Sequence, residues 1–287
     1  MVSDRRMRLR SALVLLLALA VLPVSAKDEP RRPWVVATYA YPERDRLAAI
    51  RPLADYLAKR GRHPVQVKLF PSPTALVQAM RDGQVDVAVP NLHGYLQARR
   101  HIAQVTTLPV PQVPASQADR YRAVLVAREV ASFAEMKAKA GSVRLALVGR
   151  DSASGGFVPV QYLRSQGLDP AKAFASVVHA GSHAAALQAI VDGRADVAAL
   201  AGDVYDASRP DGIHELWRSD PIPPGPLVCR ATTDVPCQSI AAWLLDAHLE
   251  DRSVIAALRV GWPEFGDATV FVPADAARLS DVALAQD

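Results

Sequence analysis

Residues 143–163, VRLALVGRDSASGGFVPVQYL, decide the fold. Val143 to Val148 is a short apolar run of the length expected for a buried parallel strand. The run breaks into small and polar residues from Gly149 to Gly156. An apolar-periodic segment follows, which predicts a helix with Pro159 in its first turn. The pattern therefore predicts a strand, a tight turn and the start of a helix.

A helix start in this turn would present free backbone N–H groups and the positive end of the helix dipole. Ser152 and Ser154 would add two hydroxyl groups, and the two glycines would let a ligand come close. These features predict an anion-binding site. The same residues also allow a simpler interpretation, in which Asp151, Ser152 or Ser154 only caps an ordinary helix.

The N-terminus has the pattern of a secretory signal peptide. Four arginines within the first ten residues precede the apolar run Ala12–Leu22 and the small-residue site Val24-Ser25-Ala26. This pattern predicts cleavage after Ala26, so that residues 1–26 are removed and the protein is periplasmic. The alternative is an uncleaved anchor, but the apolar run is short for a membrane span of about 20 residues.

Charge gives no sign of a nucleic-acid partner. Removing the four arginines and one aspartate of residues 1–26 leaves 29 basic and 28 acidic side chains. An anion would therefore have to be held by a local site and not by the field of the whole protein. The histidines lack the spacing of a metal site, and we expect no cofactor.

The two cysteines of the chain lie eight residues apart. In an exported protein, Cys229 and Cys237 can form a local disulfide, or they can be two buried thiols. We expect a structural role in either case.

From Trp34 onward, apolar strand patterns alternate with helical patterns. Strands are expected at 34–38, 65–70, 85–89, 143–148, 175–179, 196–200 and 227–230. Helices are expected at 43–60, 74–80, 91–100, 132–140, 182–191, 237–249 and 252–260. This alternation predicts an α/β protein with mainly parallel sheets flanked by helices.

An internal repeat relates the two halves. Residues 72–89, SPTALVQAMRDGQVDVAV, match residues 182–199, SHAAALQAIVDGRADVAA, at nine of eighteen positions. Coincidence is the alternative, but Asp-Gly followed by Asp-Val-Ala is not a match of abundant residues alone. We therefore predict two lobes, the first formed by residues 34–125 and 223–287 and the second by residues 126–222. Two extended crossovers near 113–127 and 219–228 would join them, with the ligand in the cleft.

Several motifs carry a family resemblance when they are taken in order. They are Pro52–Leu57, Asp82–Ala88, Tyr121–Val126, Asp151–Gly155 with Val158-Pro159, Gly181–His183, Ser219–Pro223 and Gly261-Trp262. Together they resemble the phosphonate/phosphate-type periplasmic substrate-binding proteins of ABC importers. The resemblance implies a two-lobed type II periplasmic-binding-protein fold. It also implies a non-enzymatic protein that captures a small oxyanion for an ABC permease, and we expect a monomer.

The resemblance also implies a set of ligand-binding residues. The serine-rich turn would hold the oxyanion through Ser152, Ser154 and the amides of Ala153 and Gly155. Around it would lie Tyr121 from the hinge side, Ser182 or His183 at the next helix start, Asp203 at the organic end of the ligand, and Thr74.

The chain departs from the family pattern at three positions. The threonine of the serine-rich turn is Ala153, and Pro73-Thr74 replaces a tyrosine that opens the second helix. An acidic residue between the last prolines of the crossover is Gly225. These departures make an aminoalkyl phosphonate less expected than phosphate, phosphite or another small oxyanion.

Three other functions stay open at this point. A periplasmic sensing or accessory protein would have the same fold and hand its signal to a protein partner. A hydrolase would use Ser152 or Ser154 as nucleophile and His183 as base, although no G-x-S-x-G turn is present. A structural module would use the cleft to bind a protein.

Overall fold

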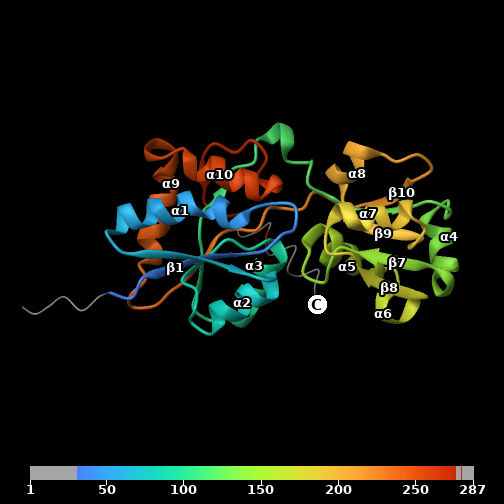
Figure 1. Cartoon of the computed structure of the whole chain (residues 1–287), viewed down its shortest axis with the longest axis horizontal. Coiled ribbons are helices and arrows are strands. Elements are labelled where there is room, and N and C mark those ends of the chain that lie inside the picture. Colours follow the sequence, from blue (N-terminus) through green and yellow to red (C-terminus); the bar gives the residue numbers. More distant parts are fainter. Residues whose placement is uncertain (1–30, 276–278, 280–287) are drawn as a thin grey trace, which may run out of the picture. The chain divides into compact units, whose positions relative to one another are not determined.

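The computed structural model describes residues 31–275 and 279. The predicted signal peptide and its cleavage site lie outside the described residues. Two five-stranded sheets organise the rest of the chain. We call the first sheet with its helices the first lobe, and the second sheet with its helices the second lobe (Figure 1).

The first sheet has the strand order β2-β1-β3-β11-β4. Its strands are β1 (Trp34–Tyr39), β2 (Val65–Phe70), β3 (Val87–Ala88), β4 (Val105–Thr107) and β11 (Val228–Arg230). Strand β1 lies between β2 and β3 and pairs in parallel with both, whereas β11 is antiparallel to its neighbours. A separate two-stranded sheet joins β5 (Val110–Pro111) to β12 (Phe271–Val272).

The second sheet repeats this arrangement. Its order is β10-β6-β9-β7-β8, with β6 (Ala123–Ala127), β7 (Arg144–Leu147), β8 (Ser176–His179), β9 (Val197–Ala201) and β10 (His214–Arg218). Strand β7 pairs in parallel with β8 and β9, as β1 does with β2 and β3. Because β6 belongs to this sheet, it crosses the predicted lobe boundary at residues 125/126. The exact boundaries stay a prediction.

Helices cover both faces of each sheet. In the first lobe, α1 (Arg46–Gly61), α9 (Cys237–Glu250) and α10 (Ser253–Gly261) pack on one face, and α2 (Pro73–Arg81) and α3 (Leu92–His101) on the other (Figure 1). In the second lobe, α7 (His183–Val191) and α8 (Gly202–Ser208) cover one face. The other face carries α4 (Phe133–Ala138), α5 (Val158–Ser165) and α6 (Pro170–Ala173).

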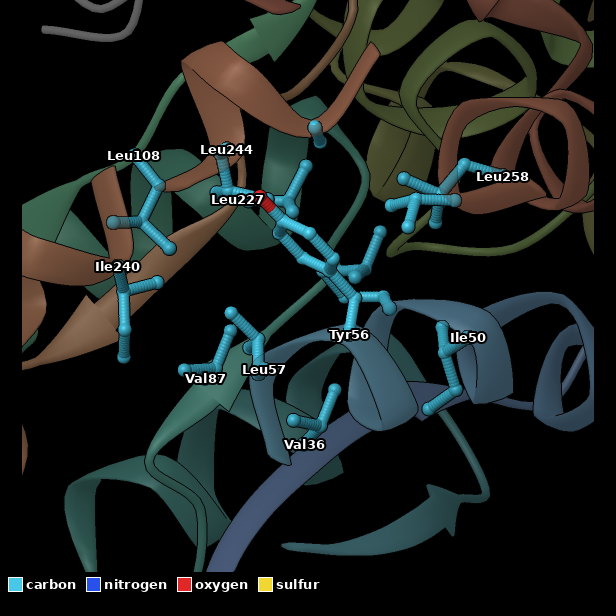
Figure 2. Close-up of a cluster of buried hydrophobic side chains, with 14 of the residues drawn as sticks. Val36, Ile50, Tyr56, Leu57, Val87, Leu108, Leu227, Ile240, Leu244 and Leu258 are labelled. Atoms are coloured by element: carbon cyan, nitrogen blue, oxygen red, sulfur yellow. The ribbon is translucent and has the colours of Figure 1, made fainter. Parts of the chain in front are cut away.

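The first-lobe core is built from apolar side chains of β1, α1, α9 and α10. Figure 2 shows Ile50 and Leu57 of α1 in the same buried cluster as Ile240 and Leu244 of α9. Tyr56 reaches into the same cluster, and its hydroxyl donates a hydrogen bond to the carbonyl of Trp243 at 2.7 Å. The polar end of this buried side chain is therefore satisfied.

Two extended segments connect the lobes side by side. The Tyr121 carbonyl accepts a hydrogen bond from the Ile222 amide at 2.8 Å, and Arg122 donates to the Ser219 carbonyl at 2.6 Å. The Ser219 hydroxyl in turn accepts from the amide of Ala123. Their pairing confirms the predicted pair of crossovers, and the fold is the two-lobed α/β architecture that the sequence predicts.

Cys229 of β11 and Cys237 at the start of α9 form a disulfide. Both cysteines are buried in the first-lobe core. The disulfide fixes the start of α9 to the sheet. Of the two alternatives given by the sequence, a disulfide or two buried thiols, the structure therefore has the disulfide. Among the described residues, no helix is both long enough and apolar enough to cross a membrane.

Candidate functional site

A cavity of about 600 Å³ lies between the two lobes. The first lobe lines it with residues 39–44 and Arg46, with residues 71–73 at the start of α2, and with Pro263-Glu264 of the short helix η4 (Pro263–Phe265). The second lobe lines it with residues 148–153 and with Ala201, Asp203 and Val204. These segments follow β1, β2, β7 and β9, so the cavity lies at the carboxyl ends of the strands, where ligands bind in open α/β sheets.

Five of the nine predicted binding residues line this cavity: Tyr121, Ser152, Ala153, His183 and Asp203. The other four, Thr74, Ser154, Gly155 and Ser182, lie beside these residues in the chain or in space but are not part of the lining. The structure thus brings one group together around the serine-rich turn. The role of all nine as ligand contacts stays a prediction.

In the serine-rich turn, the helix starts earlier in the chain than the apolar periodicity of the sequence predicts. A π-helical turn, η3 (Ala153–Phe157), precedes α5, and Ser152 is its N-cap. The Ser152 hydroxyl accepts a hydrogen bond from the Gly155 amide at 3.1 Å. The capping interpretation therefore holds for Ser152, and the Gly155 amide is already engaged.

The amides of Ala153 and Ser154 remain at the tip of this helix. These N–H groups lie in the first turn, where no preceding helical carbonyl is available to accept their hydrogen bonds. No other hydrogen bond to them is made by the residues that the structure describes. Since Ala153 lines the cavity, the positive end of the helix meets the cavity at this residue.

Two features of the sequence place the helix tip. Pro159 has no N–H to offer the Gly155 carbonyl one turn earlier, and this carbonyl instead accepts from the Val148 amide at 2.8 Å. A Cβ on Gly155 would lie 2.2 Å from Cγ2 of Val148 and 3.1 Å from Cε1 of His183. The glycine therefore lets the helix start pack against the end of β7 and against the neighbouring histidine.

Ser154 lies behind the helix tip, next to Tyr121. Its side chain is fully buried, and its hydroxyl has no hydrogen-bond partner among the described residues. Burial raises the pKa of Tyr121 well above its usual range, and the nearby Ser154 hydroxyl opposes this rise. The two hydroxyls do not form a hydrogen bond with each other. Both hydroxyls thus stay protonated, and that of Tyr121, which lines the cavity, can donate to a bound oxyanion.

His183 is held as a neutral hydrogen-bond donor. Its Nδ1 accepts from the Ala201 amide at 3.1 Å, which leaves the proton of the neutral ring on Nε2. Burial, followed by the charges of Arg46 and Arg44, lowers its pKa to about 4. The ring is only half-buried because one side faces the cavity, but the surrounding protein still desolvates it.

Thr74 and Ser182 occupy equivalent helix starts in the two lobes. The Ser182 hydroxyl caps α7 by accepting from the Ala185 amide at 3.1 Å. The Thr74 amide donates to the carboxylate of Asp151 at 3.1 Å, and Asn91 donates to the backbone carbonyl of Asp151 at 2.7 Å. Asp151 therefore joins the serine-rich turn of the second lobe to the first lobe.

Arg46 is a cavity residue that the sequence reasoning missed. It opens α1, is 6% exposed and lines the cavity. Its guanidinium carbon lies 4.2 Å from the ring centre of Tyr39 and 4.9 Å from those of Tyr41 and Trp262. The alternation of Tyr39 and Tyr41 before a basic helix start was the available signal, but it cannot show that the arginine is buried.

Four acidic side chains line the cavity: Glu43, Asp151, Asp203 and Glu264. Of these, the sequence predicts only Asp203 as a ligand contact. Burial raises the pKa of Asp203 and Glu264, even though each keeps one side open to the cavity. No acidic side chain could replace Gly225, because a Cβ there would lie 2.5 Å from the backbone carbon of Asn91. The crossover thus contributes close packing at this position.

Comparison with solved structures supports the same fold. A protein from Xanthomonas citri bound to chloride ion is 21% identical with a TM-score of 0.71, covering 88% of this chain and 96% of its own. A binding-protein component of an ABC phosphonate transporter from Pseudomonas aeruginosa is 20% identical with a TM-score of 0.68, covering 89% and 86%. PhnD1 from Prochlorococcus marinus in complex with methylphosphonate is 17% identical with a TM-score of 0.67, covering 88% and 97%.

No curated protein matches the sequence significantly. The family model of the periplasmic phosphonate substrate-binding proteins of ABC transporters matches residues 36–277. That range includes both sheets except for the first two residues of β1, and every residue of the cavity lining. The family consists of substrate-binding proteins and not of enzymes, and it is periplasmic. The chain belongs to the family of periplasmic phosphonate substrate-binding proteins of ABC transporters.

Proposed function

We propose that the cavity captures a small oxyanion of the phosphonate, phosphate or phosphite type and presents it to an ABC permease. The protein would act as a monomer after cleavage of residues 1–26. The observation that carries the proposal is the tip of η3, where the amides of Ala153 and Ser154 have no acceptor beside a cavity. Such amides and the helix dipole favour a bound anion.

The neighbouring groups support the same ligand chemistry. His183 offers Nε2–H at the cavity, and Tyr121 offers a protonated hydroxyl. Hydrogen bonds from such donors to a charged oxygen are shorter and stronger than those between neutral groups. Closure of one lobe over the other would then enclose the anion by a hinge motion of the paired crossovers.

The binding experiment compares phosphate, phosphite, methylphosphonate and sulfate by thermal shift and calorimetric titration. A ligand at a hundred times its dissociation constant raises the free energy of unfolding by about 2.7 kcal/mol. At least one phosphorus oxyanion is expected to produce a shift of this size. If none of them binds, the proposal is wrong.

The helix tip can be tested by removing one N–H group. Ala153 is the first residue of η3, and Ser152 has the extended backbone that a following proline requires. Ala153→Pro should therefore fold normally but weaken binding of the best oxyanion about tenfold, the cost of one charge-assisted hydrogen bond. Ala153→Gly keeps the N–H and serves as the control. Equal affinities for the two variants would remove the Ala153 amide from the site.

A further inference from the structure

Arg46 is buried and forms no ion pair with a described residue, although its charge opposes the rise in the pKa of Glu264 in the same cavity. Its Nε donates to the Gly261 carbonyl at 3.0 Å, whereas Nη1 is enclosed and has no hydrogen-bond partner. No carboxylate of the described residues lies within ion-pair distance of this guanidinium. Burying a charge without a partner is costly, so such a group usually has a specific role.

Three aromatic rings compensate the cation only in part. Tyr39, Tyr41 and Trp262 surround the guanidinium at cation–π distance, and Tyr41 also lines the cavity. A ring face attracts a cation but accepts no strong, directed hydrogen bond of the kind that a carboxylate or phosphoryl oxygen accepts. The rings therefore orient Arg46, while Nη1 has no hydrogen-bond acceptor among the described residues.

Arg46 and the tip of η3 lie on different lobes, on the two sides of the cavity. Arg46 belongs to the first lobe, whereas Ala153 and Ser154 belong to the second, and the cavity lies between them. The cavity volume of about 600 Å³ is in the range of sites for organic ligands and far exceeds what a bare oxyanion fills. A ligand that fills it can contact both lobes at once.

We infer that Arg46 binds a second anionic group of the ligand, so that the substrate is a doubly anionic organic phosphonate or phosphate. Its phosphoryl head lies at the tip of η3, and its second acid group, a carboxylate or another phosphoryl group, lies at Arg46. This inference rests on the proposed function, because the head group occupies the proposed oxyanion site. A guanidinium is suited to this role because its planar N–H groups pair with two oxygens of one acid.

The acidic side chains of the cavity define the competing possibility. Glu43, Asp203 and Glu264 could instead hold an ammonium group, whereas the fourth acidic side chain, Asp151, already accepts from the Thr74 amide. Glu43 and Asp203 are exposed and Glu264 is half-buried, whereas Arg46 is almost fully buried. The desolvated cation thus gains more from an opposite charge than any of these three carboxylates does.

The test uses ligands that share a phosphonate head and differ in the tail. Ethylphosphonate has a neutral tail, phosphonoacetate and 3-phosphonopropionate have anionic tails, and 2-aminoethylphosphonate has a cationic tail. Of the two anionic-tail ligands, the one that binds more tightly is expected to bind the wild type about tenfold more tightly than ethylphosphonate does. This is the gain in affinity that one hydrogen-bonded charge pair contributes. A wild type that prefers the neutral or the cationic tail would overturn the inference.

Variants then separate ligand recognition from a structural role. Arg46→Met should abolish the preference for the anionic tail and leave the affinity for ethylphosphonate within about twofold, because only one of the two ligands reaches this side chain. Arg51→Met changes an exposed arginine of the same helix outside the cavity and should leave both affinities unchanged. Equal losses for both ligands in Arg46→Met would show that Arg46 only supports the fold.

Arg46→Lys keeps the test decisive if Arg46→Met does not fold. Lysine retains the charge but loses the planar fork, so the preference for the anionic tail should fall without disappearing. An unchanged preference in Arg46→Lys would contradict paired binding of an acid group. If wild-type protein binds ethylphosphonate but shows no tail preference, only this inference fails. If it binds no phosphonate or phosphate, the proposed function fails as well.

Discussion

At the scale of single residues, the site depends on neutral donors held in fixed orientations. His183 is the clearest example, because the Ala201 amide donates to its Nδ1 and thereby fixes the tautomer. Burial and two nearby arginines keep the ring uncharged by lowering its pKa to about 4. An oxyanion therefore meets a hydrogen-bond donor without the pH dependence of a histidine that titrates near pH 6.5.

The same residue makes stability depend on pH. The ordinary histidine pKa is about 6.5, so between pH 6.5 and pH 4 the unfolded chain binds a proton at His183 and the folded protein does not. The free energy of unfolding should therefore fall as the pH is lowered through this range. We predict a shallower fall for His183→Asn, which keeps an acceptor for the Ala201 amide.

Urea denaturation at intervals from pH 7 to pH 4 measures this slope. His101→Asn changes an exposed histidine of α3 and should retain the wild-type slope. A wild-type slope in His183→Asn would show that this histidine does not titrate differently in the folded protein.

At the scale of elements, each lobe contains the same helix–turn–strand unit. Ser72 and Ser182 cap α2 and α7. The pairs Gln78–Asp82 and Gln188–Asp192 are hydrogen-bonded at the ends of these helices. Gly83 and Gly193 then have the positive φ that ends each helix, 77° and 68°. The matched residues of the repeat thus have matched structural roles, which explains why coincidence is a poor account of them.

The second aspartate of the repeat also has one role in both lobes. Asp86 accepts from the Val35 amide at 2.8 Å and pairs with Arg32, and Asp196 accepts from the Arg144 amide at 2.7 Å and pairs with the Arg144 side chain. The Asp86 side chain is fully buried, whereas that of Asp196 is 27% exposed. Each carboxylate therefore joins the start of the repeat strand to the neighbouring parallel strand, β1 or β7.

We predict unequal costs for removing these two carboxylates. Asp86→Ala leaves a buried amide and an arginine unpaired and should lower the free energy of unfolding by about 3 kcal/mol. Asp196→Ala, its matched control, breaks an exposed pair and should cost about 1 kcal/mol. Urea denaturation of both variants at pH 7 measures the difference, and equal losses would contradict the assigned effect of burial.

At the scale of the whole molecule, the lobes meet through Asp151. Its carboxylate accepts from the Thr74 amide and its carbonyl accepts from Asn91. Phe157 of η3 packs against His93 of α3 with ring centres 4.9 Å apart. These contacts lie beside the cavity, so they contribute to holding the lobes together around a ligand.

Two variants of Asp151 separate its contact from its charge. Asp151→Asn keeps a hydrogen-bond acceptor for Thr74 and removes a negative charge beside the cavity, so it should bind methylphosphonate at least as tightly as the wild type. Asp151→Ala also removes the acceptor and should bind about threefold more weakly than Asp151→Asn, as the loss of one ordinary hydrogen bond implies. Calorimetric titration measures both affinities. Indistinguishable affinities would show that the contact with Thr74 plays no part in binding.

The sequence by itself determined the α/β class, the repeat, the paired lobes and the helix start at the serine-rich turn. These features depend on short-range patterns: apolar periodicity, capping residues, and Asp-Gly turns, which act within a few neighbouring residues. Only the tertiary structure decided that Arg46 and Glu264 line the cavity, that the Ser152 hydroxyl is used as a cap, and that Asp151 joins the lobes. Burial of a charged side chain and contacts between residues far apart in the chain depend on how the packed elements meet, and no local pattern encodes that geometry.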